Sequence, residues 1–375
     1  MGVRAEPSFA LKDQLFNAGT VAQLAARIEA AHPPFARKAF EAAVLAAYPQ
    51  LELKARIAHT VDVLEAYLPA DFAAAMQILR DSLPARLDPS LSDDDFGQFI
   101  WAVPGEWMAR HGVSADRLEQ ALDFLMEATQ RFTSEGALRP FLRAFPEHTL
   151  AAVHAWTEHD NYHVRRLASE GIRPYLPWAV RAPLAADTII AVLDKLHRDP
   201  TRFVVRSVAN TLNDISKDDP DLVVKTLRRW RGRRVDAELD WLSRHALRTL
   251  LKQDHPGALA LLGYTAEPDF ELHQVEITPR LHIGEKLSIQ AALLSASEQR
   301  LKVTVKVHFL KANGKHSAKV FALRDGVLQA GETLSLRKEV AFRPMTTRTL
   351  YPGAHYVEIL VNGVGHERVR FELLV

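Results

Sequence analysis

The sequence of 375 residues contains no cysteine. This absence excludes disulfide bonds, a thiolate nucleophile, and the zinc or iron–sulfur sites that depend on cysteine. No apolar run approaches the ~18 residues of a membrane-spanning helix. The first residues, 1–12, also lack the apolar stretch of a secretion signal. We therefore expect a protein of the reducing cytoplasm that has no membrane partner.

Motifs for several common chemistries are missing as well. His159 and His163 have no third partner at a metal-binding spacing. The sequence contains no glycine loop that cradles phosphate, no Ser/His/Asp pattern of a hydrolase and no metalloprotease helix. We expect neither a metal nor an organic cofactor. Nucleotide hydrolysis and proteolysis are not expected either.

The net charge of +1 conceals an uneven distribution of charge. Residues 1–100 hold 9 Lys and Arg against 13 Asp and Glu, whereas residues 161–252 hold 18 against 11, a net charge of +7. This basic part contains the cluster Arg228-Arg229-Trp230-Arg231-Gly232-Arg233-Arg234. Arginine binds phosphate well, so we expect contacts with a polyanion here. A solvated loop between helices is the alternative.

Residues 8–265 have the apolar spacing of helices, with breaks at prolines. Within this region the pattern Val164-Arg165-x-Leu167-Ala168 returns downstream as Val205-Arg206-x-Val208-Ala209. A looser copy, Ser243-Arg244-x-Ala246-Leu247, follows after a similar interval. This spacing, a period of about 40 residues, is typical of HEAT-like repeats, in which pairs of helices stack into a solenoid with one long concave surface.

The first of these copies carries a polar face that a core does not need. His163, Arg166 and Glu170 are spaced so that they share one face of a helix whose other face is apolar. Glu170 belongs to a Ser-Glu-Gly triplet that occurs again at residues 134–136. Proline follows each triplet closely, which predicts that Glu135 and Glu170 both lie near helix C-termini, where the helix dipole disfavours negative charge. The glycine after each glutamate would let a substrate approach the backbone closely.

After residue 267 the apolar period changes from helical to alternating. Turn residues such as Asn313-Gly314 separate about seven short segments over about 105 residues, which predicts an immunoglobulin-like β-sandwich. The expected strands are Leu272–Thr278, Leu287–Leu294, Val303–Leu310, Lys319–Leu323, Thr333–Phe342, His355–Val361 and Arg368–Leu374. The predicted architecture is thus an all-α HEAT-like repeat solenoid, residues 1–266, followed by an all-β immunoglobulin-like sandwich, residues 267–375.

Several motifs of the helical region together carry a resemblance. They are Phe132-Thr133-Ser134-Glu135, His163-Val164-Arg165-Arg166-Leu167-Ala168-Ser169-Glu170-Gly171, Leu176-Pro177-Trp178-Ala179, Asn213-Asp214-Ile215-Ser216-Lys217 and Trp241–Leu250. In these motifs the chain resembles the DNA alkylation repair glycosylases of the AlkC type, the HEAT-like repeat relatives of AlkD. The match spans the helical region, and before about residue 100 it rests mainly on pattern. Some members of that family carry an added immunoglobulin-like domain.

The resemblance implies a DNA glycosylase that excises cationic N3-methylated bases, chiefly 3-methyladenine and also 3-methylcytosine, without flipping the base out of the duplex. It implies that carboxylates stabilise the positive charge that develops on the sugar and position the attacking water. Carried over by motif, Glu170 ranks first in this role, Glu135 second and Asp214 third. Alkylated double-stranded DNA is the implied partner, and we expect the protein to be a monomer.

Basic residues of the matched region, and of two turn-rich segments in the sandwich, are the expected DNA contacts. They are Arg166, His163, Arg173, Arg206, Arg228, Arg229, Arg231, Arg233, Arg244, Lys315 and Arg348. Trp156 and Trp178 are candidates for contact with the lesion, with packing in the core as the alternative.

The carboxylates have a structural alternative. Glu170 can pair with Arg166, and Glu135 with Arg139, as ordinary ion pairs one helical turn apart. For the protein as a whole, the alternative is a non-catalytic HEAT-repeat scaffold that binds DNA or other proteins. A binding scaffold has no reason to direct carboxylates at phosphate-rich DNA, and this separates the two functions.

Three arginines and one aspartate also have structural alternatives. Arg165, Arg206 and Arg244 stand at the repeat position where HEAT-like units often pair arginine with aspartates such as Asp160. Asp214 can instead cap a helix end. In these cases the residues would stabilise the fold and take no part in a site.

Overall fold

The structure is a computed structural model of the chain, and it describes residues 10–91, 96–232, 235–343, 349–366 and 368–375. The chain divides into two compact units. The first comprises residues 1–218 and 235–246, and the second comprises residues 219–234 and 247–375. The expected domains, 1–266 and 267–375, follow the change from helices to strands, and that boundary stays a prediction.

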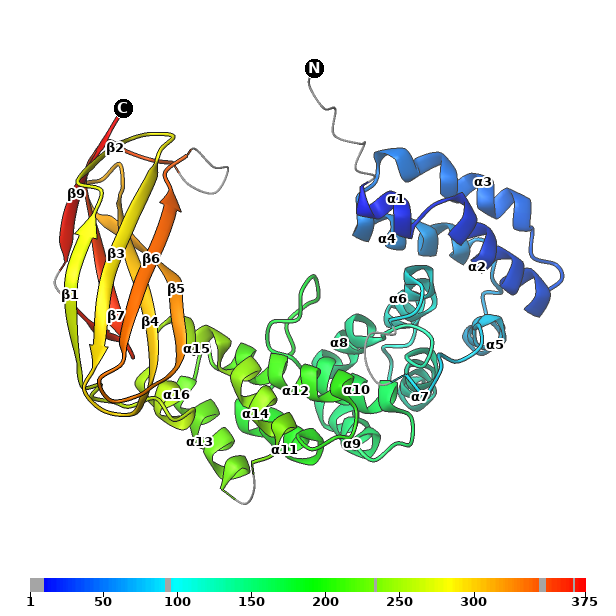
Figure 1. Cartoon of the computed structure of the whole chain (residues 1–375). Helices are drawn as coiled ribbons and strands as arrows, with labels where there is room; N and C mark the ends of the chain where they lie inside the picture. The colour runs from blue at the N-terminus through cyan, green and yellow to red at the C-terminus, as the bar shows by residue number, and fades with distance from the viewer. Residues whose placement is uncertain (1–9, 92–95, 233–234, 344–348, 367) are drawn as a thin grey trace. The chain divides into compact units, whose positions relative to one another are not determined.

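The first unit is a stack of helices (Figure 1). They are α1 (Leu11–Leu15), α2 (Ala18–Ala31), α3 (Arg37–Ala47), α4 (Leu53–Glu65), α5 (Phe72–Ser82), α6 (Ala102–His111), α7 (Leu118–Ala128), α8 (Glu135–Ala144), α9 (Pro146–Trp156), α10 (Tyr162–Glu170), α11 (Ala186–Leu196), α12 (Arg202–Ile215) and α14 (Ala237–Ala246), with 3-10 turns at Tyr48–Gln50 and Phe99–Trp101. In one row α4 packs against α6 and α6 against α8, and in the same way α10 packs against α12 and α12 against α14. Helix α9 packs against α8 and α10, and α11 against α10 and α12. This pairing confirms the predicted helical repeat.

Helix α10 carries the central motif, and its sequence sets its start and its buried face. Asn161 caps the helix, because its side-chain oxygen accepts a hydrogen bond from the backbone N–H of His163 at 2.9 Å. Val164, Leu167 and Ala168 are fully buried, as the apolar stripe predicted. The polar residues between them are therefore held at fixed positions along the row of helices.

The two Ser-Glu-Gly triplets lie at opposite ends of their helices. Glu170 is the last residue of α10, as predicted, but Glu135 is the first residue of α8, so the predicted C-terminal position of Glu135 is wrong. The error comes from Pro140, which lies inside α8 and does not end it. A proline inside a helix removes one backbone hydrogen bond and its ring crowds the carbonyl group four residues earlier, but α8 continues past this position to Ala144. The dipole of α8 therefore favours the charge of Glu135.

Arginine–carboxylate pairs link successive repeats. Arg165 binds Asp199 at 2.5 Å, and Arg202 binds Glu238 at 2.5 Å. Asp160 accepts a hydrogen bond from Arg165 through its backbone carbonyl, at 2.8 Å. The predicted ladder therefore includes Arg165, but its carboxylate comes from Asp199, which lies just before α12 in the next repeat, and not from Asp160.

The second unit combines short helices with strands (Figure 1). Its elements are α13 (Pro220–Arg231), α15 (Arg248–Lys252), α16 (Pro256–Leu261), β1 (Phe270–Ile277), β2 (Arg280–His282), β3 (Lys286–Ser295), β4 (Gln299–Leu310), β5 (His316–Leu328), β6 (Thr333–Ala341), β7 (Gly353–Val361), β8 (Val364–Gly365) and β9 (Val369–Leu374). One sheet has the order β1-β3-β6, and the other has the order β2-β9-β7-β4-β5, with β8 beside β7. Strand β2 runs parallel to β9, and the other pairings are antiparallel.

These sheets confirm the predicted sandwich. The seven expected strands correspond to β1, β3 to β7 and β9. Alternate residues of β4, from Leu301 to Phe309, are buried in the core, as a period of two requires. Aliphatic and aromatic packing between the sheets takes the place of a disulfide bond. No helix in the described part of the chain has the length and apolar content needed to cross a membrane.

Candidate functional site

Three carboxylates and three cations form one chain of contacts across α8, α10, α12 and the segments that follow α10 and α12. In order they are Glu135, Arg166, Glu170, Arg173, Asp214 and Lys217. Neighbours have opposite charges, and the N–O distances between them are 2.9, 3.8, 2.6, 2.9 and 2.8 Å. The stacked repeats bring these helices together. We call this set of six residues the carboxylate network, and it contains all three predicted carboxylates.

Glu170 lies at the centre of the network, and its side chain is only 5% exposed. Its Oε1 accepts a hydrogen bond from Arg173 Nη1 at 2.6 Å, and its Oε2 accepts one from Ser207 Oγ at 2.6 Å. Burial opposes ionisation, but the charges of Arg166 and Arg173 and the hydrogen bond from Ser207 outweigh it and hold the pKa of Glu170 below its usual value. Glu170 is therefore a buried carboxylate that stays charged at neutral pH.

Ser207 is a partner that sequence reasoning missed, although the repeat offers a signal for it. It stands one repeat unit after Arg166, at the same position of the repeated pattern. Its Oγ lies 2.9 Å from Ser169 Oγ as well as 2.6 Å from Glu170. A hydroxyl group has one proton, and a charged acceptor binds it more strongly, so Ser207 donates to Glu170 and accepts from Ser169.

Asp214 lies in the last turn of α12 and is only 2% exposed. Its Oδ2 accepts a hydrogen bond from Arg173 Nε at 2.9 Å, and its Oδ1 accepts one from Lys217 Nζ at 2.8 Å. The alternative that Asp214 caps a helix end is therefore wrong. Burial opposes the charge of Arg173, but Glu170 and Asp214 raise the pKa of Arg173 above its usual value. One guanidinium thus joins two buried carboxylates.

Glu135 is the carboxylate that is open to solvent, with its side chain 22% exposed. Its Oε2 accepts hydrogen bonds from Arg166 Nη1, at 2.9 Å, and from the hydroxyl group of Thr133. Within the described residues, Oε1 accepts no hydrogen bond. Glu135 therefore presents one carboxylate oxygen that a ligand or a water molecule can reach.

Arg166 was expected to contact phosphate, but its guanidinium is committed to the protein interior. It lies over the ring of Phe203, 4.4 Å from the ring centroid, and is buried. Burial opposes its charge, yet Glu135 and Glu170 raise the pKa of Arg166 above its usual value. His163, expected in the same role, is buried too. Phosphate binding by these two residues stays a prediction. For Arg166 it requires DNA to displace the contacts with Glu135 and Phe203.

Arg139 is another buried cation, and its partners differ from the one expected from the sequence. It was considered as a partner for Glu135, but it donates hydrogen bonds to the backbone carbonyls of Gly171 and Arg173 at 2.8 Å and of Val180 at 2.7 Å. Burial, with repulsion from Arg173, lowers the pKa of Arg139 to about 10, so the side chain remains charged at neutral pH. Arg139 therefore fixes the segment after α10, which carries Arg173.

The two candidate tryptophans lie in different surroundings. Trp156 is buried in the helical core. Trp178 is 70% exposed and has a φ of 63°, a left-handed conformation that is strained for such a side chain. Its backbone carbonyl accepts a hydrogen bond from Lys54 Nζ. Of the two, Trp178 is placed to meet a ligand.

Most of the remaining predicted DNA contacts lie at or near the surface. The exposed or partly exposed ones are Arg206, Arg228, Arg229, Arg231, Arg244 and Lys315. Arg244 also binds Asp240 on its own helix at 2.7 Å. Arg233 and Arg348 lie outside the described residues. Contact between these basic residues and DNA stays a prediction.

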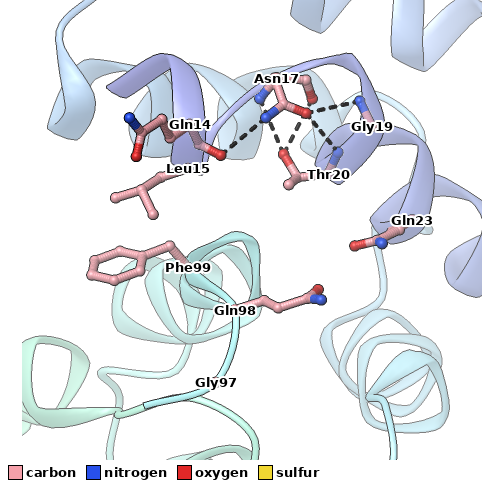
Figure 2. A pocket seen from close by; sticks show the side chains of 9 residues that line it. All are labelled: Gln14, Leu15, Asn17, Gly19, Thr20, Gln23, Gly97, Gln98 and Phe99. Atoms are coloured by element: carbon pink, nitrogen blue, oxygen red, sulfur yellow. Dashed lines mark hydrogen bonds between the residues drawn. The ribbon is translucent and has the colours of Figure 1, made fainter. Parts of the chain in front are cut away.

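Neither a metal site nor the pocket at the start of α2 adds to the carboxylate network in the described part of the chain. Among the described residues, no group of three or more His, Asp or Glu side chains is placed to hold a metal ion. A pocket of about 430 Å³ lies between the start of α2 and residues 97–99 (Figure 2). Its walls are uncharged, and Asn17 turns its side chain toward Gly19 and Thr20, where it caps α2. No residue of the carboxylate network lines this pocket.

Comparison with known proteins identifies relatives of both parts of the chain. Residues 118–250 match the family described as DNA alkylation repair enzyme, and residues 271–375 match the family described as the C-terminal Ig-like domain of the uncharacterised protein YhaZ. The chain is 34% identical over 365 residues to the uncharacterized protein YhaZ of Bacillus subtilis (strain 168), which covers 96% of this chain and 98% of that protein. It is also similar to Pseudomonas fluorescens alkylpurine DNA glycosylase AlkC, whose structure is bound to DNA containing an abasic site analog. The identity is 34%, the TM-score is 0.84, and the match covers 98% of this chain and 100% of that one.

Proposed function

This chain belongs to the AlkC-type family of DNA alkylation repair enzymes, and we propose that it is a DNA glycosylase that excises cationic N3-methylated bases from duplex DNA. The expected bases are 3-methyladenine first and 3-methylcytosine second. The observation that carries the proposal is the carboxylate network, in which Glu170 is buried and yet held ionised. Excision without base flipping follows from the family resemblance and is part of the same proposal.

The chemistry needs negative charge at the sugar and no strong acid at the base. Methylation at N3 gives the base a positive charge, so the bond to C1′ breaks with both electrons moving to the base, which leaves as a neutral molecule. The sugar is left with a positive charge shared between C1′ and the ring oxygen. Water then bonds to C1′, and its proton passes to a carboxylate or to solvent. Carboxylates fixed beside C1′ lower the energy of this cation and direct the water.

The three carboxylates suit different parts of this task. Glu135 meets the sugar and the water, because it is partly exposed and its Oε1 is open. Glu170 and Asp214 add negative charge from within the protein, and Arg173 fixes both of them. Such a network is already in place before DNA binds, so little reorganisation is required during the reaction.

A non-catalytic scaffold that binds DNA is the second candidate function. Phosphate binding is strongest when arginines face solvent, whereas Arg166 and Arg173 are largely buried and are paired with carboxylates. Burial of an ion costs several kcal/mol before its partners compensate. DNA binding alone gives no reason to bury Glu170 and Asp214 beside these arginines, and the network therefore favours the glycosylase.

The test is the release of free base. Purified protein is incubated with methylated duplex DNA, and the bases freed from the DNA are identified by mass spectrometry while abasic sites are counted on the DNA. We expect 3-methyladenine in amounts that match the abasic sites. Tight binding to the same DNA without any free base would favour the scaffold.

A further inference from the structure

The three carboxylates of the network differ in how far a ligand can reach them. Glu170 and Asp214 are buried, and both oxygens of each accept hydrogen bonds from neighbouring side chains. Glu135 is partly exposed, and its contacts with Thr133 and Arg166 both fall on Oε2. Among the three carboxylates, a ligand therefore reaches Glu135 first.

Gly136, the residue after Glu135, stands beside open space. It is exposed in the first turn of α8 and has no positive φ, so its conformation does not require glycine. Within the described part of the chain, a methyl group built on Gly136 meets no atom within 4 Å apart from its chain neighbours and the backbone of its own helix. Packing therefore does not require glycine at this position either.

The second Ser-Glu-Gly triplet shows the contrast. A methyl group built on Gly171 would lie 2.6 Å from the side chain of Leu138, so glycine there lets α10 pack against α8. Glycine weakens a helix relative to alanine. The glycine of α8 thus weakens its helix, and no contact within the described part of the chain accounts for it.

We propose that the sugar–phosphate strand of the damaged nucleotide lies against Gly136, and that the open space at its α-carbon is filled by the substrate. This inference rests on the proposed glycosylase function. A side chain at position 136 would push the strand away from Glu135. A displacement of about 1 Å between reacting groups reduces a rate about 100-fold. Gly136 therefore limits how closely the strand approaches the carboxylate.

The experiment adds side chains of increasing size and measures excision and stability. The full-length variants Gly136→Ala and Gly136→Leu are compared with the wild type in single-turnover release of 3-methyladenine at saturating protein. We expect losses of about tenfold for alanine and about 100-fold for leucine, with thermal melting of Gly136→Ala no lower than that of the wild type. The control is Ala151→Leu, which places the same leucine side chain at an exposed position of α9 and should leave the rate unchanged.

A wild-type rate in Gly136→Leu would overturn the inference, as would an equal loss in Ala151→Leu. If the wild type releases no base at all, the proposed function fails, and affinity for a duplex with an abasic site analogue then decides the inference separately. Weaker binding of Gly136→Leu than of Ala151→Leu would support contact at Gly136, and equal affinities would overturn it.

Discussion

Replacement of Ser207 by alanine removes one hydroxyl group that binds the Glu170 carboxylate. Ser207 Oγ lies 2.6 Å from Glu170 Oε2, and both residues are buried. A hydrogen bond to a charged group contributes about 1.5–3 kcal/mol to stability. Ser207→Ala should therefore lower the free energy of unfolding of the helical unit by about this amount at pH 7, because alanine leaves one oxygen of a buried carboxylate without its donor.

The size of this loss should depend on pH. The folded protein holds the pKa of Glu170 below its ordinary value of 4.5. Ionised Glu170 therefore stabilises the fold above pH 4.5, and this contribution is lost as the pH falls through the lower pKa of the folded state. Protonated Glu170 gains less from the hydroxyl group. The difference between the wild type and Ser207→Ala should shrink as the pH falls below 4.5.

Urea unfolding followed by far-ultraviolet circular dichroism measures this difference from pH 7 down to pH 3, a range that extends well below 4.5. Thr211→Val is the matched control, because Thr211 is buried on the same helix and binds the backbone carbonyl of Ser207, at 2.9 Å. Its loss of stability should be the same at every pH. A Ser207→Ala loss that does not change with pH, or one below about 0.5 kcal/mol at pH 7, would refute the assignment of a charge-assisted bond.

Three further predictions concern other parts of the chain. Arg173→Met should cost about 3–5 kcal/mol in urea unfolding, because Glu170 and Asp214 lose the cation that joins them; a loss below about 1 kcal/mol would contradict the bridge. Burial lowers the pKa of His355 below 6.5, so its neutral ring stabilises the sandwich above that pH and the contribution is lost on acidification. Thermal melting of the second unit should fall between pH 7 and pH 5, with a weaker fall in His355→Phe, and identical pH profiles would argue against this. The double variant Arg228→Gln, Arg229→Gln should reduce the slope of log affinity for DNA against log salt by about 1–2, whereas an unchanged slope would mean that α13 does not contact phosphate.

The sequence was sufficient to predict the architecture because period and repeat are visible along the chain. Alternation predicted the seven longer strands, whereas β2 and β8 are too short to show a period. The repeated Val-Arg-x-Leu-Ala pattern predicted the stacked helices and the position of Arg165. Pro140 misled the prediction of α8, because a proline inside a helix and a proline after a helix end look alike in sequence.

The carboxylates of the candidate site could be predicted from motifs, but their partners could not. The shortest ion pair of Glu170 is with Arg173, which follows the end of α10. The ion pair with Arg166, one helical turn before Glu170, is longer. Ser207 reaches Glu170 from the next repeat, and this contact depends on how two helices face each other. The repeat marks Ser207 as equivalent to Arg166, but the contact itself is a property of packing that a single sequence does not display.

The most direct test of the central claim is the rate of 3-methyladenine release at saturating protein, compared among the wild type, Glu135→Gln, Glu170→Gln and Asp214→Asn. Each variant removes one negative charge with little change of shape. We predict a loss of about 100-fold or more for Glu135→Gln and Glu170→Gln, because both lose charge that stabilises the sugar cation, while affinity for the DNA stays equal or becomes tighter. Wild-type rates in all three variants, or no release by the wild type, would contradict the account.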